Sequence, residues 1–191
     1  VNGAECEPYI TSDTRTMVEN PKLVIAGAKM LQKYIGVKRI IFAIEDNKPQ
    51  CIDSLRRLVP AETGMEVMSL PSLYPQGGEK VMIYNTIGKI VPEGKLPLDA
   101  GAIVINCTTL AAIAKYCATG MPLVEKCVTV DGSAVKTPKN VIAPIGTSLA
   151  DVFAFCDGFK KEPKKVIYGG PMMGIAVPNL EQPILKNTNA I

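Results

Sequence analysis

Histidine is absent from this 191-residue sequence, and so is tryptophan. Ser-His-Asp and Cys-His arrangements need an imidazole as their base, so both are excluded within this chain. The six cysteines are far apart and form no CxxC pair. Because structural zinc sites and iron–sulfur clusters need closely spaced Cys or His ligands, we expect no metal site in this segment. Scattered cysteines in apolar surroundings instead predict reduced, buried thiols of a cytoplasmic protein.

Long apolar runs and blocks of like charge are also lacking. The apolar runs, such as 101–107, are far shorter than the roughly 20 residues that span a bilayer. A net charge of +3, with 47% hydrophobic and 20% charged residues, is typical of a soluble globular protein and gives little support for nucleic-acid binding. The most basic stretch, FKKEPKK at 159–165, is interpreted as a solvated turn. With no initial methionine and no secretory signal, we expect a piece of a longer polypeptide.

Strand and helix patterns alternate over the first 120 residues. Continuous apolar runs predict strands and apolar residues at helical spacing predict helices, the first of them starting at a proline with Asn20 as its N-cap. Because strands that are apolar throughout are covered on both faces, we predict a three-layer α/β domain with a largely parallel sheet. The predicted strands are 38–45, 65–70 and 101–106, and the predicted helices are 21–35, 47–60, 78–87 and 109–120.

After residue 120 the pattern changes. Apolar and polar residues alternate over 122–135, and the Asp131-Gly132 pair within this stretch predicts a hairpin. A strand at 140–145, a helix at 147–156 capped by Thr147 or Ser148, and a strand at 164–168 that ends in a Gly-Gly-Pro turn are predicted to follow. We therefore predict two domains, 1–120 and a small α+β domain at 121–191.

Three loops stand where parallel α/β sheets bind ligands, at the carboxyl ends of strands. They are NGAECEP at 2–8, YPQGGEK at 74–80 and INCTTL at 105–110. In the second loop, the two glycines allow close backbone approach, and the helix that follows attracts phosphate, although a Gly-Gly pair is more often only a turn. In the third, polar side chains suit a ligand, but Thr108 is equally suited to cap the next helix.

The first loop carries two carboxylates. In an extended segment Glu5 and Glu7 point the same way with Cys6 opposed, and Pro8 favours that conformation. Paired carboxylates suit sugar hydroxyls, an amide or a metal. On composition alone, however, solvated loop acids are the simpler interpretation.

A further glycine-rich stretch, YGGPMMG at 168–174, is interpreted differently. No helical pattern follows it, so no helix dipole is available to hold an anion. We predict a tight turn with Met172 and Met173 packed into the core of the small domain.

Six longer motifs occur in a fixed order, namely NGAECEPYITSDTR, IEDNKP, YPQGGEK, GKIVPEGKLPLDAGAIVINCTTL, GMPLVEKCVTVDG and VIYGGPMMG. Together they resemble the RnfC subunits of Rnf electron-transport complexes, over essentially the whole chain. That family is similar in turn to the NADH-oxidising flavoprotein subunit of respiratory complex I. The resemblance implies a Rossmann-like domain that binds FMN and NADH, followed by a β-grasp-like domain of the SLBB type.

The resemblance also implies a function. A subunit of this kind passes electrons between NADH and iron–sulfur clusters through FMN, within a membrane-associated, ion-translocating NAD:ferredoxin oxidoreductase. The implied partners are NAD(H), the other subunits of an Rnf complex and, indirectly, ferredoxin, and the implied location is the cytoplasmic face of the cell membrane. The 4Fe-4S clusters are expected in the full-length protein and not in this fragment.

By motif position, the resemblance assigns cofactor binding to four residues of the acidic loop, three of the loop beneath the flavin and two polar flavin contacts. Complex I relatives have acids where this chain has an alanine and the second glycine of its Gly-Gly pair. No catalytic acid, base or metal ligand is expected, because the cofactors themselves carry hydride chemistry. The nine residues are Asn2, Ala4, Glu5, Glu7, Gly77, Gly78, Glu79, Asn106 and Thr109.

Two expected parts of the family are missing from the sequence. A glycine-rich phosphate loop precedes the acidic segment in such proteins, and two CxxCxxCxxxCP motifs follow the small domain. The fragment is therefore expected to be incomplete for catalysis. Two alternatives stay open: an RnfC-like soluble protein that serves a cobalamin or amino-acid reductase, and a non-catalytic binding module in this excised form.

Overall fold

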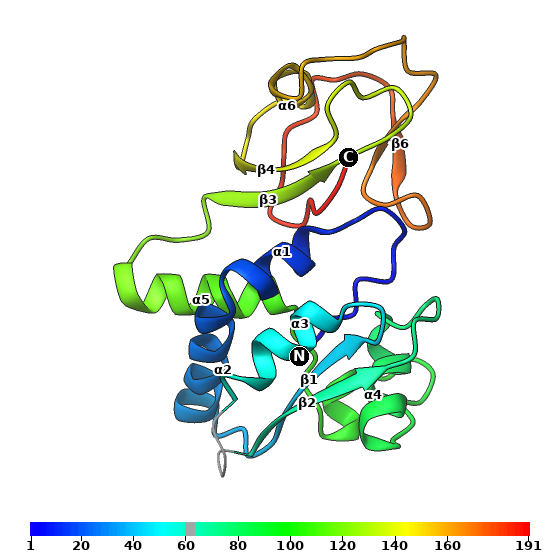
Figure 1. Ribbon diagram of the computed structural model, residues 1–191. Helices are drawn as coiled ribbons and strands as arrows, with labels where there is room; N and C mark the ends of the chain where they lie inside the picture. Colours follow the sequence, from blue (N-terminus) through cyan, green and yellow to red (C-terminus); the bar gives the residue numbers. More distant parts are fainter. Residues whose placement is uncertain (60–63) are drawn as a thin grey trace. The chain divides into compact units, whose positions relative to one another are not determined.

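The chain forms two compact units. The computed structural model describes residues 1–59 and 64–191. The first unit comprises residues 1–6 and 13–120, and the second comprises residues 7–12 and 121–191 (Figure 1). Residues 7–12 thus belong to the second unit, although the sequence places them within the first predicted domain.

The helices of the first unit follow the predicted order, with two additions. The bounds of α2 and β2 are those predicted, whereas α1 and η1 were not predicted. The predicted end of the third helix at residue 60 lies outside the described residues. The elements are α1 (Ser12–Glu19), α2 (Pro21–Ile35), β1 (Ile40–Glu45), α3 (Pro49–Arg56), β2 (Met65–Leu70), α4 (Glu79–Ile87), η1 (Pro97–Ala100) and α5 (Cys107–Thr119).

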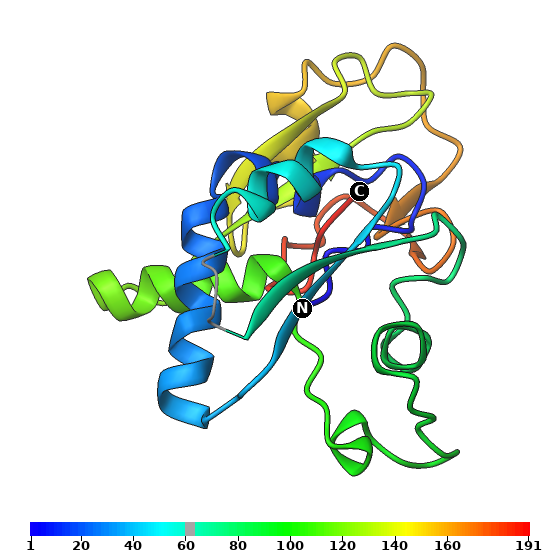
Figure 2. The same cartoon turned by 60° about the horizontal axis from the view of Figure 1, so that its bottom comes forward.

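β1 and β2 form a parallel pair, with Ile40 opposite Met65 at one end (Figure 2). The first residues of the chain extend this sheet, since Asn2 forms parallel bridges with both Ala43 and Asn106. The segment 101–106 was predicted as a regular strand, but it joins the sheet only at its last residue. That prediction is wrong in extent, because an apolar run of this kind does not by itself fix how many of its residues find a pairing partner.

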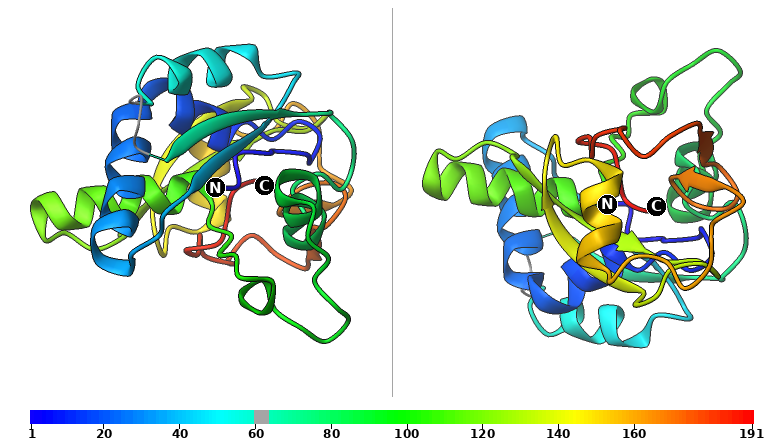
Figure 3. Two further views of the ribbon diagram at one scale, coloured as in Figure 1. Left: turned by 90° about the horizontal axis from the view of Figure 1, so that it is seen from below. Right: turned by 90° about the horizontal axis from the view of Figure 1, so that it is seen from above.

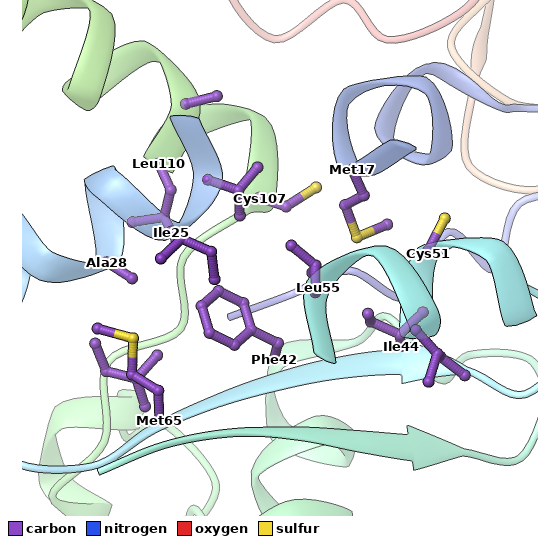
Figure 4. Packing of buried hydrophobic residues seen from close by; sticks show 14 residues of the cluster. Met17, Ile25, Ala28, Phe42, Ile44, Cys51, Leu55, Met65, Cys107 and Leu110 are labelled. Atoms are coloured by element: carbon purple, nitrogen blue, oxygen red, sulfur yellow. The ribbon is translucent and has the colours of Figure 1, made fainter. Parts of the chain in front are cut away.

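Both faces of the sheet are covered, as a three-layer α/β fold requires. Phe42 and its alternate neighbours pack against α2, α3 and α5, and Figure 4 shows Phe42 among Ile25, Leu55 and Met65. Ala43 points to the opposite face, where it packs with Met82 of α4. The alternation of side chains along β1 therefore divides the core into two layers, which confirms the predicted class.

The N-terminus of α2 differs in detail from the prediction. Asn20 occupies the N-cap position, but its side chain makes no capping hydrogen bond. Its carbonyl oxygen instead accepts hydrogen bonds from the backbone N–H groups of Leu23 and Val24. Pro21 at the first helical position suits this arrangement because its missing N–H needs no partner there. α2 then crosses α5 (Figure 3).

The second unit contains the predicted hairpin and helix. Ser148 caps α6 through a hydrogen bond from the N–H of Asp151, which decides between the two predicted caps. Thr11 donates its N–H to Thr129 Oγ1 and so attaches the segment 7–12 to this unit. The elements are β3 (Glu125–Val130) and β4 (Lys139–Pro144), which pair antiparallel, α6 (Leu149–Phe155), and β5 (Val166–Tyr168) and β6 (Ile175–Val177), which also pair antiparallel.

The prediction for the methionines of the glycine-rich turn is wrong. Met172 is 55% exposed and Met173 is 75% exposed, so neither is packed into the core. The turn between β5 and β6 is too tight for either side chain to fold back inward, since Gly169 adopts a φ of 107° and Gly174 donates its N–H to the Gly170 carbonyl. A strand, β6, follows the turn, in agreement with the predicted lack of a helix.

Within the described ranges, no helix has both the length and the apolar character needed to cross a bilayer.

Candidate cofactor-binding site

The first and second predicted ligand loops meet at the carboxyl end of the sheet. Asn2 donates from Nδ2 to the carbonyl oxygen of Gly77 at 2.9 Å and accepts from the N–H of Ala4 at 3.1 Å through Oδ1. A Cβ on Gly77 would lie 2.8 Å from the Ala4 carbonyl oxygen, closer than real contacts allow. The Gly77 N–H also lies 3.4 Å from Cys6 Sγ. Only glycine lets the two loops come this close.

Glu5 has a different role from a solvated loop acid. Its side chain is only 8% exposed, so that interpretation is wrong. One carboxylate oxygen accepts the N–H of Asp13 at 2.8 Å, and the other accepts the N–H and hydroxyl of Thr14 at 3.1 and 2.7 Å. Glu5 therefore satisfies the free N–H groups at the start of α1, as a capping side chain would.

Burial and charge both act on this carboxylate. Burial raises the pKa of Glu5, and the nearby Asp13 carboxylate raises it further, while the hydrogen bonds from Thr14 and Asp13 partly oppose the shift. Because the folded pKa lies above the unfolded value, the folded chain holds this proton more tightly. Stabilisation from this group is present below the unfolded pKa and is lost as pH rises through the folded pKa.

The raised pKa of Glu5 predicts how the stability of the fold depends on pH. A Glu5→Gln variant lacks the titrating group, so the excess of the wild-type free energy of unfolding over that of the variant should be largest near the unfolded carboxyl pKa of about 4.3 and shrink as pH rises. Urea unfolding at several pH values measures it. An excess that grew with pH would mean that the carboxylate form of Glu5 is the one the fold prefers.

The third loop is joined to the same network through Asp13. Asn106 caps α5 by accepting the N–H of Thr108 at 2.8 Å, and its Nδ2 donates to Asp13 Oδ2 at 2.7 Å. The Thr108 hydroxyl donates to Asp13 Oδ1 at 2.8 Å. Of the two alternatives left open for Thr108, capping of α5 is excluded, because Asn106 precedes it and takes the capping position. Thr109 lies exposed in the first turn of the helix.

Glu7 belongs to the second unit. Its carboxylate accepts the backbone N–H groups of Met172 and Met173 at 2.9 and 2.8 Å. The two acids of the opening loop therefore bind two different sets of backbone amides. A carboxylate that is fixed in this way by two N–H groups defines the conformation of the turn between β5 and β6.

The loop before α4 has features that fit a flavin nucleotide. The Gln76 side chain is only 3% exposed, and its Nε2 has no hydrogen-bond partner among the described residues. Gly78 occupies the N-cap position of α4 without a side chain to cap it, and Glu79 lies exposed in the first turn. The first N–H groups of a helix lack partners within it and attract phosphate or carbonyl oxygens. These donors suit the polar edges of FMN.

A buried ion pair between Lys48 and Glu45 is hydrogen-bonded to the backbone of the acidic loop. Lys48 Nζ lies 3.0 Å from Glu45 Oε2 and donates to the Glu5 carbonyl oxygen at 3.0 Å. Glu45 is 2% exposed and ends β1. Sequence reasoning missed both residues as parts of the site, although they stand in the IEDNKP motif. It also missed Asp13, since the polar segment that forms α1 gave no helical signal.

The buried cysteines have properties expected of unreactive thiols. Burial raises the pKa of Cys51 to about 11 and raises that of Cys107 well above its ordinary value. Three of the six cysteines, Cys51, Cys107 and Cys156, are buried, as predicted. Cys117 is exposed and Cys6 and Cys127 are half-buried, so the prediction of buried thiols is wrong for these three.

Residues 1–115, more than half of the chain, match the family of the Nuo51 FMN-binding domain. The chain belongs to this family. The match includes all three loops described above, and residues 127–176 of the second unit match the SLBB domain. The RnfC resemblance is therefore confirmed at the level of domains, with an FMN-binding-type domain followed by an SLBB domain.

Three curated relatives match this chain over its whole length. Each of them is an RnfC-type subunit. The chain is 46% identical to the one from the proton-translocating ferredoxin:NAD(+) oxidoreductase complex of Clostridium ljungdahlii and 41% identical to the one from the Na(+)-translocating complex of Acetobacterium woodii. It is 38% identical to the one from an ion-translocating oxidoreductase complex of Rhodobacter capsulatus. All of this chain is matched in each case, but it spans only 42%, 43% and 37% of those proteins.

A solved structure shows the same fold. A chain in the crystal structure of an NAD+-reducing [NiFe]-hydrogenase in its air-oxidised state superposes with a TM-score of 0.80 over 98% of this chain and 37% of that chain. The sequences are 22% identical.

Proposed function

We propose that this chain is the nucleotide-binding part of an NADH-oxidising, FMN-linked electron-transfer subunit of an Rnf-type NAD:ferredoxin oxidoreductase. The observation that carries the proposal is the junction of Asn2 with Gly77 and Asn106 at the carboxyl end of the sheet, within the part of the chain that belongs to the FMN-binding family. The identities of 38–46% with RnfC-type subunits of such complexes support it.

The residues of this chain have defined tasks in the proposal. The backbone at Ala4 and the glycine loop at Gly77 and Gly78 form a surface on which a flat ring system lies without meeting side chains. Gln76, Glu79, Asn106 and Thr109 supply hydrogen bonds to its polar groups. FMN, when bound, supplies the hydride and single-electron chemistry, so the protein contributes binding and orientation and no acid or base.

Glu5 and Glu7 have different roles in the proposed binding of the cofactors. Glu5 acts as a positioning residue, since its carboxylate oxygens already accept three hydrogen bonds and fix the loop that carries Ala4. Glu7 is proposed to orient NADH by holding the loop that follows it in the chain. Ferredoxin, the 4Fe-4S clusters of the longer protein, the other subunits of the complex and a location on the cytoplasmic face of the membrane belong to the same proposal.

The test is a titration of FMN and then NADH into the full-length protein, followed by flavin absorbance. We expect FMN to bind and NADH to bleach it. Asn2→Ala removes the side-chain hydrogen bond that joins the first loop to Gly77 and the one to Ala4 within the first loop. It should weaken FMN binding at least about 10-fold, the effect of losing one or two buried hydrogen bonds. Asn179→Ala, which removes an exposed hydrogen bond to Glu181 in the second unit, is the matched control and should leave affinity unchanged.

Two results would overturn the proposal. One is a full-length protein that binds no FMN. The other is bound flavin that NADH does not reduce, which would indicate a binding role without NADH oxidation.

A further inference from the structure

The second unit contains a cavity of about 850 Å³ that the proposed function does not use. It is lined by four separate segments of that unit, namely 8–10, 129–138, 153–171 and 190–191, and every lining residue belongs to the second unit. The volume falls within the range of roughly 300–1,000 Å³ that is typical of small-molecule sites.

The wall of this cavity is apolar and aromatic. Phe153 and Phe159 both line it, and their ring centroids are 4.7 Å apart at an interplanar angle of 46°. Val135 and Val166 also line the cavity. A surface of this kind favours a flat, apolar molecule over a sugar or a peptide backbone, because it offers dispersion contacts and few hydrogen-bond partners.

The rim of the cavity is basic. The loop from α6 to β5, drawn in gold to orange in Figure 1, carries the FKKEPKK stretch. Its four lysines line the cavity and are exposed, and two acids, Glu162 of the same loop and Asp131, line it as well, so the lysines are in excess. The lysines are Lys160, Lys161, Lys164 and Lys165. A solvated turn accounts for their exposure, but not for their position around an apolar cavity, where they favour an anionic ligand.

Tyr9 provides an independent observation at the same cavity. It lines the cavity, is 77% exposed and has a φ of 69°, which is the left-handed region that an aromatic residue seldom adopts. Strain of this kind persists where a function requires the conformation. Glycine would adopt this φ freely, so the exposed tyrosine side chain is kept beside the cavity at the expense of stability.

We propose that this cavity binds a small aromatic anion, a flat ring system that carries one sulfonate-, carboxylate- or phosphate-like group. The ring lies against the two phenylalanines with Tyr9 beside it, and the anionic group faces the lysines of the rim. The proposal does not depend on FMN binding, which concerns the first unit.

The probe is 8-anilino-1-naphthalenesulfonate, compared with N-phenyl-1-naphthylamine, which has the same rings and no charge. Fluorescence titrations of the folded full-length protein should show one saturable site for the sulfonate. We expect the neutral compound to bind at least about 10-fold more weakly, and higher salt to weaken only the charged one.

Two variants assign the binding to this cavity. Replacing the four rim lysines by glutamine should weaken the sulfonate at least about 10-fold and the neutral compound less than about 2-fold. The matched control replaces four exposed lysines of the first unit, Lys22, Lys29, Lys33 and Lys38, and should change neither. Tyr9→Gly should weaken both compounds about 5-fold while leaving the thermal midpoint equal or higher, a combination that a purely structural tyrosine does not give.

Several outcomes would overturn the proposal. These are binding that does not saturate, equal affinity for the two compounds, or an unchanged affinity in the lysine variant. A Tyr9→Gly variant that binds normally would remove the tyrosine from the site.

Discussion

Replacing Lys48 by methionine should lower the free energy of unfolding by about 3–5 kcal/mol, the cost of removing one member of a buried ion pair. Glu45 is 2% exposed, and Lys48 Nζ lies 3.0 Å from its Oε2. Among the described residues, the hydroxyl of Ser72 also donates to this carboxylate, at 3.4 Å from Oε1. Without the ammonium group, Glu45 would keep a buried charge that this one weak hydrogen bond cannot compensate.

The loss also affects the candidate site. Lys48 donates to the Glu5 carbonyl oxygen as well, so the variant loosens the backbone between Ala4 and Cys6. Urea unfolding followed by circular dichroism measures the stability. The loss should be smaller at acidic pH, where a Glu45 without its partner can take up a proton and become neutral.

A double variant separates the ion pair from its surroundings. Glu45→Leu combined with Lys48→Met replaces both charges by apolar groups and should recover most of the lost stability, since buried pairs are often no better than apolar replacements. Lys22→Met, at an exposed position at the start of α2, is the control and should change stability by less than about 0.5 kcal/mol. A single Lys48→Met variant as stable as this control would show that the pair contributes nothing.

The sequence predicted best those elements whose signals are local. The bounds of α2 follow from a proline start and helical spacing, and those of β2 follow from a continuous apolar run. The alternating order of strands and helices also placed the candidate loops at the carboxyl end of the sheet. Asn2 and Gly77 are 75 positions apart in the chain, yet the general property of parallel sheets brings them together.

The parts that sequence reasoning missed depend on contacts between distant residues. The segment of α1 is largely polar, and it forms a helix here with its first N–H groups satisfied by Glu5, which lies outside the helix. No spacing within α1 contains that information. The same holds for Met172 and Met173, whose composition indicates a core but whose backbone amides bind Glu7, more than 160 positions away, while their side chains stay exposed.

The contact between α2 and α5 leads to the second large effect. Replacing Gly27 by alanine should lower the free energy of unfolding by about 2–3 kcal/mol, the cost of overpacking a tight contact. A Cβ at this position would lie 2.1 Å from the carbonyl oxygen of Leu110 and 2.6 Å from its carbonyl carbon. These are backbone atoms of α5, so no side chain can rotate away and the two helices must separate.

Helix propensity would change the stability in the opposite direction, which makes the result of this test unambiguous. Within a helix, alanine is favoured over glycine by about 1 kcal/mol, so Gly27→Ala would stabilise the chain if the position were open. Lys29→Ala, at an exposed position of the same helix, is the control and should shift stability by less than about 0.5 kcal/mol. Urea unfolding of the two variants therefore shows whether Gly27→Ala lowers or raises the free energy of unfolding. A stabilised Gly27→Ala variant would mean that α2 and α5 do not approach at Gly27 and Leu110, and the packing of Ile25 and Ala28 against α5 would then have to be revised as well.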